Sequence, residues 1–97
     1  MFRHIVLLHW KENTPAEAVQ AVTAAYKQLR RLIPEIHSYQ FGHDLKLYES
    51  NADYALVADF ADEEDFRRYV AHPAHAELMA DVSMPIMASD SSVQFQY

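Results

Sequence analysis

The segment that most constrains the fold is residues 3–10, which are apolar on both faces of any strand they form. These residues are rich in types that favour strands. Alternate side chains of a strand point to opposite faces. One face carries His4, Val6, Leu8 and Trp10, and the other carries Ile5, Leu7 and His9. A strand covered on one side only alternates apolar with polar residues, so we expect a strand covered on both sides.

A helix is predicted next, from Thr14 to Pro34. Thr14 is expected to accept a hydrogen bond from the backbone N–H of Glu17, whose side chain reaches back, and Pro15 suits the first helical position. Pro34 ends the helix. Apolar residues recur at spacings of three and four, the pattern of an amphipathic helix, at Val19, Val22, Tyr26, Leu29 and Ile33.

Two more strands, a second helix and a last strand follow. Residues 36–42 and 54–60 are predicted strands, and the polar residues 49–53 between them are a loop. Asp62 is the expected N-cap of the second helix, whose first turn is acidic. Pro73 interrupts this helix, and residues 74–82 are predicted to form a further helical turn or two. Alternation of apolar and polar residues over 92–97 marks the last strand.

This order, β-α-β-β-α-β, predicts an α+β fold of the ferredoxin-like split type over a single domain, residues 1–97. Four antiparallel strands would carry both helices on one face and leave the other face bare. Ile5 and Leu7 lie on that second face, so we expect a second copy of the chain to cover it. The predicted assembly is a homodimer in which two sheets pair face to face as a dimeric α/β barrel.

Charge and composition exclude several classes of partner. Eight Lys and Arg stand against 14 Asp and Glu, a net charge of −6, whereas nucleic acids and anionic membranes bind basic surfaces. No apolar run approaches the ~20 residues that span a bilayer, and the first run is too short for a signal peptide, so a soluble cytoplasmic protein is expected. The chain has no Cys, which excludes disulfides, thiolate catalysis and cysteine-ligated metals.

The sequence resembles the Dabb family of stress-responsive dimeric α/β-barrel proteins. The most specific match is the segment 69–75, which ends in His-Pro-Ala-His, and residues 3–6, 32–34 and 42–44 support it. The resemblance extends from about Phe2 to Tyr97. It implies a homodimer whose two sheets form a barrel, sometimes assembled into larger rings.

One member of this family, the plant olivetolic acid cyclase, is a cofactor-free enzyme that folds and aromatises a polyketide. The resemblance places its catalytic Tyr-His pair on Tyr69 and His75, and its pocket residues on His4, Tyr26 and His72. Where the enzyme has a further pocket histidine, this chain has Tyr54. Val22 and Thr23 stand where it has pocket aromatics. The shape of the cavity, and hence its substrate, is expected to differ.

His75 is the candidate general base, because an imidazole both takes and returns a proton near neutral pH. If the Tyr69 phenol converges with it, the phenol could hold a carbonyl or enolate oxygen while His75 removes a proton from the adjacent carbon. Each residue also has a structural interpretation. His72 could cap the last carbonyls of the second helix, and Tyr69, Tyr26 and His4 could be satisfied core residues.

Two functions therefore remain open. A cavity between helices and sheet would hold a small apolar carbonyl compound. The residues expected at it are the catalytic candidates Tyr69 and His75 and the substrate-binding candidates His4, Val6, Leu8, Tyr26 and His72. The protein would either catalyse a cofactor-free cyclisation, isomerisation or lyase reaction there, or be a non-catalytic stress or ligand-binding dimer. His72 and His75 lack a third metal ligand in a known motif, so no metal site is expected.

Overall fold

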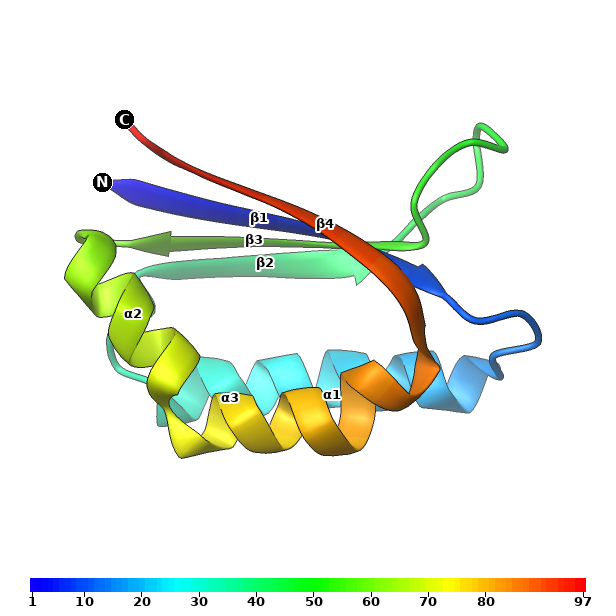
Figure 1. Cartoon of the computed structure of the whole chain (residues 1–97), viewed down its shortest axis with the longest axis horizontal. Helices are drawn as coiled ribbons and strands as arrows, with labels where there is room; N and C mark the ends of the chain where they lie inside the picture. The colour runs from blue at the N-terminus through cyan, green and yellow to red at the C-terminus, as the bar shows by residue number, and fades with distance from the viewer.

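A four-stranded sheet forms one layer of the molecule and helices form the other, in a computed structural model that describes residues 1–97 (Figure 1). The elements are β1 (Phe2–Trp10), α1 (Ala16–Leu32), β2 (Ser38–His43), β3 (Tyr54–Phe60), α2 (Glu63–Ala71), α3 (Pro73–Leu78) and β4 (Met87–Gln96). A π-helical turn, η1 (Met79–Ser83), and a 3₁₀ turn, η2 (Met84–Ile86), join α3 to β4. No helix has the length and apolar character needed to cross a membrane.

The sheet has the strand order β2-β3-β1-β4, and every neighbouring pair is antiparallel. This arrangement confirms the predicted ferredoxin-like α+β fold. β1 lies in the interior of the sheet, where His4 is opposite Ala58 of β3 and Gln94 of β4.

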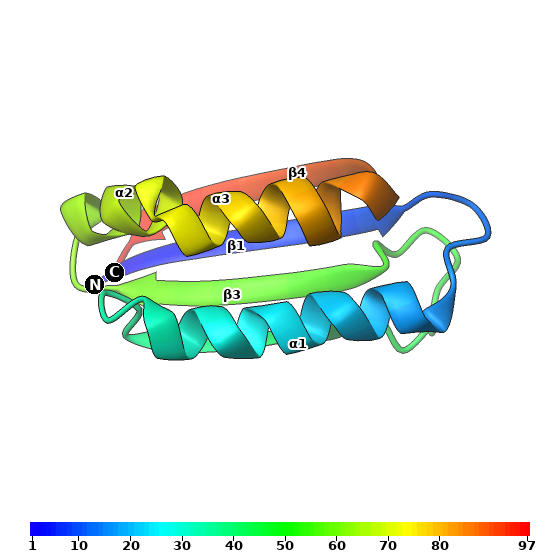
Figure 2. The ribbon, with the colours of Figure 1, turned by 90° about the horizontal axis from the view of Figure 1, so that it is seen from below.

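The helices cover one face of the sheet. Figure 2 shows α1 and α3 side by side and antiparallel, with α2 leading into α3 at one end. The expected apolar stripe of α1 is buried, and it packs on the helix-facing side chains of β1 and β3. The core formed in this way comprises Phe2, Leu8, Val22, Tyr26, Leu29, Ile33, Ile36, Tyr54, Leu56, Ala58, Phe60, Tyr69 and Leu78.

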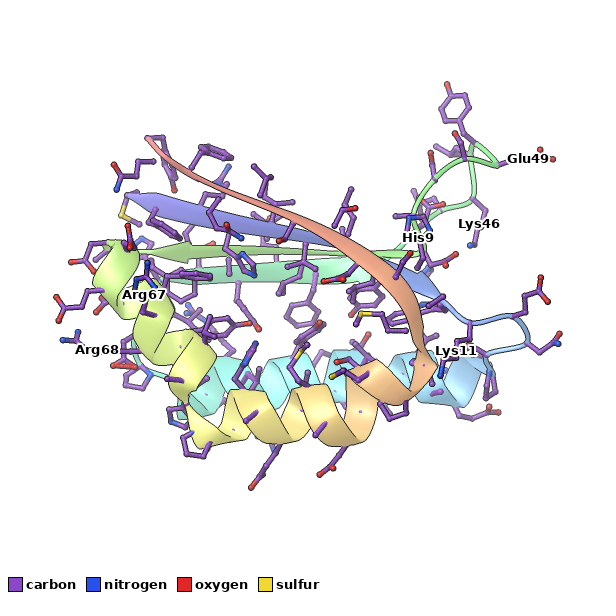
Figure 3. The ribbon with its side chains drawn as sticks, viewed as in Figure 1. His9, Lys11, Lys46, Glu49, Arg67 and Arg68 are labelled. Atoms are coloured by element: carbon purple, nitrogen blue, oxygen red, sulfur yellow. The ribbon has the colours of Figure 1, made fainter.

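The opposite face of the sheet, here called the open face, carries no helix (Figure 1). Leu7 of β1 is 42% exposed there, and Val93 and Phe95 of β4 are 53% and 43% exposed. The β4 strand thus points its apolar side chains away from the helices and its polar Gln94 toward them, next to His4. The loop between β2 and β3 rises on the open-face side, as its labelled residues Lys46 and Glu49 show in Figure 3.

The two helix starts differ from each other. The expected cap of α2 is confirmed, because the Asp62 carboxylate accepts from the backbone N–H of Asp65 at 2.9 Å. The expected cap of α1 is wrong. α1 begins at Ala16, and the Thr14 hydroxyl donates to the carbonyl of Lys11 at 2.6 Å instead. Thr14 therefore closes the turn before the helix, and its hydroxyl does not bond the first helical N–H groups.

Two strand boundaries also move. β2 begins at Ser38, two residues later than predicted, because Ile36 is buried in the core and the Arg30 guanidinium donates to the carbonyls of Ile36 and His37. β4 begins at Met87, well before the polar-apolar alternation starts. The residues that follow Met87, 88–91, contain no apolar side chain larger than alanine, so no hydrophobic period marks them as a strand.

Candidate functional site

A cavity of about 170 Å³ lies between the sheet and the segment that runs from α2 to η1. β1, α1, α2 and α3 each place at least one side chain on its wall. Six of the seven residues expected at the site line it: His4, Val6, Leu8, Tyr26, Tyr69 and His75. The fold therefore brings together residues that lie up to 71 positions apart in the chain, from His4 to His75.

His72 is the seventh, and it does not line this cavity. Its Nδ1 atom accepts a hydrogen bond from the backbone N–H of Ala74 at 3.1 Å, which caps the start of α3. His72 is also the C-cap of α2, as one interpretation of the sequence proposed, but the group that donates to the Tyr69 carbonyl, at 3.2 Å, is its backbone N–H. The imidazole instead serves the helix that follows it. Pro73 at the first position of α3 suits the same role, since it has no N–H to satisfy.

The segment after α3 supplies cavity residues that sequence reasoning did not find. η1 is a π-helical turn, a feature often found at functional sites. It places both Met79 and Ser83 on the wall, and the Ser83 hydroxyl lies 3.5 Å from the Met79 sulfur. The exposed residues Val70, Asp90 and Ser92 also line the cavity and mark its solvent side.

Tyr69 and His75 meet at the cavity although Pro73 interrupts the helix between them. Their ring centroids are 4.6 Å apart and the rings are tilted by 58°. Tyr69 is only 1% exposed, and its hydroxyl lies 2.7 Å from the hydroxyl of Tyr39 on β2. Burial raises the pKa of Tyr69 to about 12, while the hydrogen bond with Tyr39 acts in the opposite direction. Tyr69 is therefore a neutral phenol at physiological pH.

The two cavity histidines are both uncharged at neutral pH. Burial lowers the pKa of His75, and the neighbouring Val70 carbonyl opposes this only in part. Burial and the nearby His75 lower the pKa of His4 to about 4. The side-chain N–H of Gln94 donates to His4 Nδ1 at 2.9 Å, so the ring proton of His4 resides on Nε2. The site thus offers one imidazole as a base and another as an N–H donor.

Tyr39 and Gln94 were not identified from the sequence, although each holds a cavity residue in place. Gln94 could have been suspected, because it belongs to the polar row of β4 that faces the helix layer. No local pattern marks Tyr39, since it lies 30 residues from Tyr69 in the chain. No group of three or more His, Cys, Asp or Glu side chains lies close enough to hold a metal ion.

These features define a class of small α/β-barrel domains. They are a ferredoxin-like sheet with helices on one face, an apolar open face and a small cavity between the helices and the sheet. Within this class, the chain belongs to the stress responsive A/B barrel domain family, Dabb, whose family model matches residues 2–95. The predicted family is therefore confirmed.

Several known proteins are similar to the chain. The stress-response A/B barrel domain-containing protein HS1 of Arabidopsis thaliana is 26% identical over 77 residues, 77% of this chain and 71% of that protein. A dimeric ferredoxin-like protein of unknown function from Thermobifida fusca is 38% identical with a TM-score of 0.91, over 99% of this chain and 90% of its own. The hydroxynitrile lyase of Passiflora edulis shares the fold, with 20% identity and a TM-score of 0.84, over 97% of this chain and 90% of its own.

Proposed function

We propose that the cavity binds a small carbonyl compound and that His75 transfers a proton on it without a cofactor. The observation that carries this proposal is the contact of a neutral imidazole with a buried phenol, 4.6 Å between ring centroids, at the wall of one small cavity. A general base must be unprotonated and within reach of the proton that it removes, and an unprotonated imidazole is uncharged. The lowered pKa of His75 meets the first condition at neutral pH.

The proposed chemistry uses three cavity residues in different roles. The Tyr69 hydroxyl and the His4 Nε2–H donate hydrogen bonds to the carbonyl oxygen of the ligand. His75 removes a proton from the adjacent carbon: the C–H bond breaks, its electron pair forms the enolate, and the proton moves to the imidazole. The two donors stabilise the negative charge on the enolate oxygen. The protonated His75 then returns the proton to the product.

The size of the cavity limits the ligand. Its volume of about 170 Å³ is close to that of an engineered apolar cavity of about 150 Å³ that binds benzene. Val6, Leu8 and Leu56 supply apolar walls. These dimensions favour a small aldehyde or ketone, and an isomerase or lyase reaction, over cyclisation of a long polyketide. The fold is compatible with a lyase, since the Passiflora edulis hydroxynitrile lyase has it.

We also infer that a second copy of this chain covers the open face. Dimeric proteins are among the structures with the same fold. The outward apolar row of β4, with Val93 and Phe95, and the exposed Leu7 of β1 form one apolar surface that pairing would bury. The cavity lies on the other side of the sheet, so each protomer would carry its own site.

Proton transfer can be tested without knowing the natural substrate. Acetophenone and phenylacetaldehyde carry exchangeable protons next to a carbonyl group, and their deuterium uptake in D₂O is followed by NMR. We expect the wild-type protein to accelerate exchange of at least one of them. His75→Ala should reduce this acceleration by at least about 100-fold, the usual contribution of a general base. Its melting temperature should stay within a few degrees of wild type.

His37→Ala is the matched control, since this histidine is exposed and lies outside the cavity. Its exchange rate should equal that of the wild type. Full activity in His75→Ala would contradict the proposal. Binding of both probes without exchange would favour the non-catalytic alternative, in which the cavity only holds its ligand.

A further inference from the structure

Two hydrogen-bonded phenols lie at the cavity wall, of which Tyr69 is buried and Tyr39 is partly buried. Tyr39 and Tyr69 have hydroxyl oxygens 2.7 Å apart, and their rings meet edge to face with centroids 6.0 Å apart. Tyr69 lines the cavity, whereas Tyr39 does not. The Tyr39 ring is itself held between other aromatic rings, 6.0 Å from Tyr26 and 5.6 Å from Phe41. Tyr39 therefore touches no ligand in the cavity but fixes a residue that does.

The direction of the hydrogen bond between the two phenols follows from their surroundings. Tyr69 is the only hydrogen-bond partner of the Tyr39 hydroxyl. If Tyr69 donated this bond, the proton of the partly buried Tyr39 hydroxyl would have no acceptor within the protein, which is costly. If Tyr39 donates, its own proton is satisfied and the Tyr69 proton is free to point into the cavity, where a ligand oxygen accepts it. With a ligand oxygen in the cavity, the second arrangement satisfies both protons and is the more stable.

We propose that Tyr39 is a positioning residue for the proposed reaction: its hydroxyl donates to Tyr69 and so directs the Tyr69 proton toward the carbonyl oxygen of the ligand. This inference rests on the proposed function, because it requires Tyr69 to donate to that oxygen. Chains of hydrogen bonds also strengthen one another, so a Tyr69 hydroxyl that accepts from Tyr39 is a stronger donor to the ligand.

Binding of 4-nitrophenolate, an oxyanion that resembles an enolate in charge and size, tests the proposal. Its dissociation constant is measured by absorbance for the wild type, Tyr39→Phe, Tyr69→Phe and the double variant. We expect Tyr39→Phe to weaken binding about tenfold when Tyr69 is present, the effect of losing a cooperative hydrogen bond. In the Tyr69→Phe background the same change should alter binding by less than about twofold, because Tyr39 acts only through the Tyr69 hydroxyl.

The chain offers a matched control in Tyr54. This phenol is also buried and hydrogen-bonded, to the Thr23 hydroxyl at 2.7 Å, but it does not line the cavity. Tyr54→Phe removes the same atom from a comparable position and should leave 4-nitrophenolate binding unchanged.

A measurement on the wild-type protein alone keeps the proposal falsifiable if a variant fails to fold. NMR of the protein labelled with ¹³C-tyrosine detects hydroxyl protons that exchange slowly with water. We expect the slowly exchanging proton of this pair on Tyr39. Its assignment to Tyr69 would mean that Tyr69 donates to Tyr39, and would overturn the proposal.

The outcomes separate the two proposals. Equal effects of Tyr39→Phe in both backgrounds would show that Tyr39 acts through packing, and would overturn its positioning role. A loss of affinity in Tyr69→Phe but not in Tyr39→Phe would also overturn that role and leave the proposed function standing. Unchanged binding in Tyr69→Phe would overturn the use of Tyr69 in the proposed function, and the role of Tyr39 with it.

Discussion

His4 is a histidine that the fold keeps uncharged. The residue is 9% exposed, and the one hydrogen bond of its side chain comes from Gln94 on the neighbouring strand β4. A protonated imidazole would carry its charge into a cavity whose other wall is largely apolar, where solvation by water is lost. The same burial that makes His4 a neutral N–H donor at pH 7 therefore makes the folded state sensitive to acid.

The acid sensitivity has a definite sign and pH range. The pKa of His4 is about 4 in the folded protein and 6.5 in an unfolded chain. Between these values the unfolded chain binds one more proton, so the free energy of unfolding falls as the pH falls from about 6.5 to about 4. His4→Asn should flatten the slope in this range by up to one proton, as measured by urea unfolding at a series of pH values.

Part of the slope should remain in His4→Asn, because the pKa of His75 is also lowered by burial and contributes with the same sign. His37→Ala is again a suitable control and should keep the wild-type slope. An unchanged slope in His4→Asn would mean that His4 is hydrated or paired more effectively than its surroundings indicate.

Sequence reasoning reached some site residues and not others, for physical reasons. The strand period places His4, Val6 and Leu8 on one face, and all three line the cavity. The contact of Tyr69 with His75 could not be derived from helical spacing, because Pro73 breaks the helix between them. It was expected only from resemblance. Tyr39 depends on a contact across the fold, which no local pattern records.

At the scale of elements, capping depends on which backbone groups are free. Asp62 stands at the start of α2 in extended conformation, with its carboxylate directed at the N–H of Asp65, as the acidic first turn predicted. Thr14 also precedes a helix, but its hydroxyl donates to the Lys11 carbonyl in the turn before α1. The geometry of the loop before α1 decides whether the Thr14 hydroxyl donates to the Lys11 carbonyl or accepts from an N–H of the helix. The sequence pattern does not specify that geometry.

Loss of the α2 cap should cost measurable stability. Asp62→Ala removes both the hydrogen bond to the first turn and a negative charge at the N-terminus of the helix, and should lower the free energy of unfolding by about 1 kcal/mol. Urea unfolding measures this change, and Asp62→Ser should recover most of it. Because Asp62 does not line the cavity, 4-nitrophenolate binding by the folded protein should be unaffected. A change in that affinity would link the cap to the site.

At the scale of the whole molecule, the strand order and the layers could be predicted from the order of strand-like and helix-like hydrophobic patterns. Few topologies join the elements of a β-α-β-β-α-β chain without connections that cross each other. The apolar residues of β1 on the second face led us to expect that a second copy covers it, and β4 strengthens that expectation by pointing Val93 and Phe95 outward. Chain order fixes how the elements of one copy connect. It does not fix how two copies meet, because no connection constrains them.

The inferred assembly predicts a change in mass. The wild type should scatter light as a particle of about twice its 11.2 kDa chain mass. Val93→Asp places an unpaired charge on the open face and should shift the mass toward that of one chain. Leu32→Asp makes the same change at an exposed position of α1, on the helix layer, and should leave the wild-type mass unchanged. A wild type of single-chain mass would contradict the inference.

The alternating side chains of β4 serve two surfaces, the cavity on one face of the sheet and the open face on the other. The polar row of β4 holds Gln94 against His4 at the cavity, and its apolar row presents Val93 and Phe95 on the open face. The pairing of β4 with β1 is irregular at one point: His9 pairs with Ser89 and Trp10 with Met87, so Ala88 is an extra residue in β4. Deletion of one residue between Ser89 and Ser92 with this irregularity retained would exchange the two rows, so that Val93 and Phe95 would fill the cavity and polar side chains would cover the open face. One such deletion would therefore remove the ligand site and the apolar surface of the open face together.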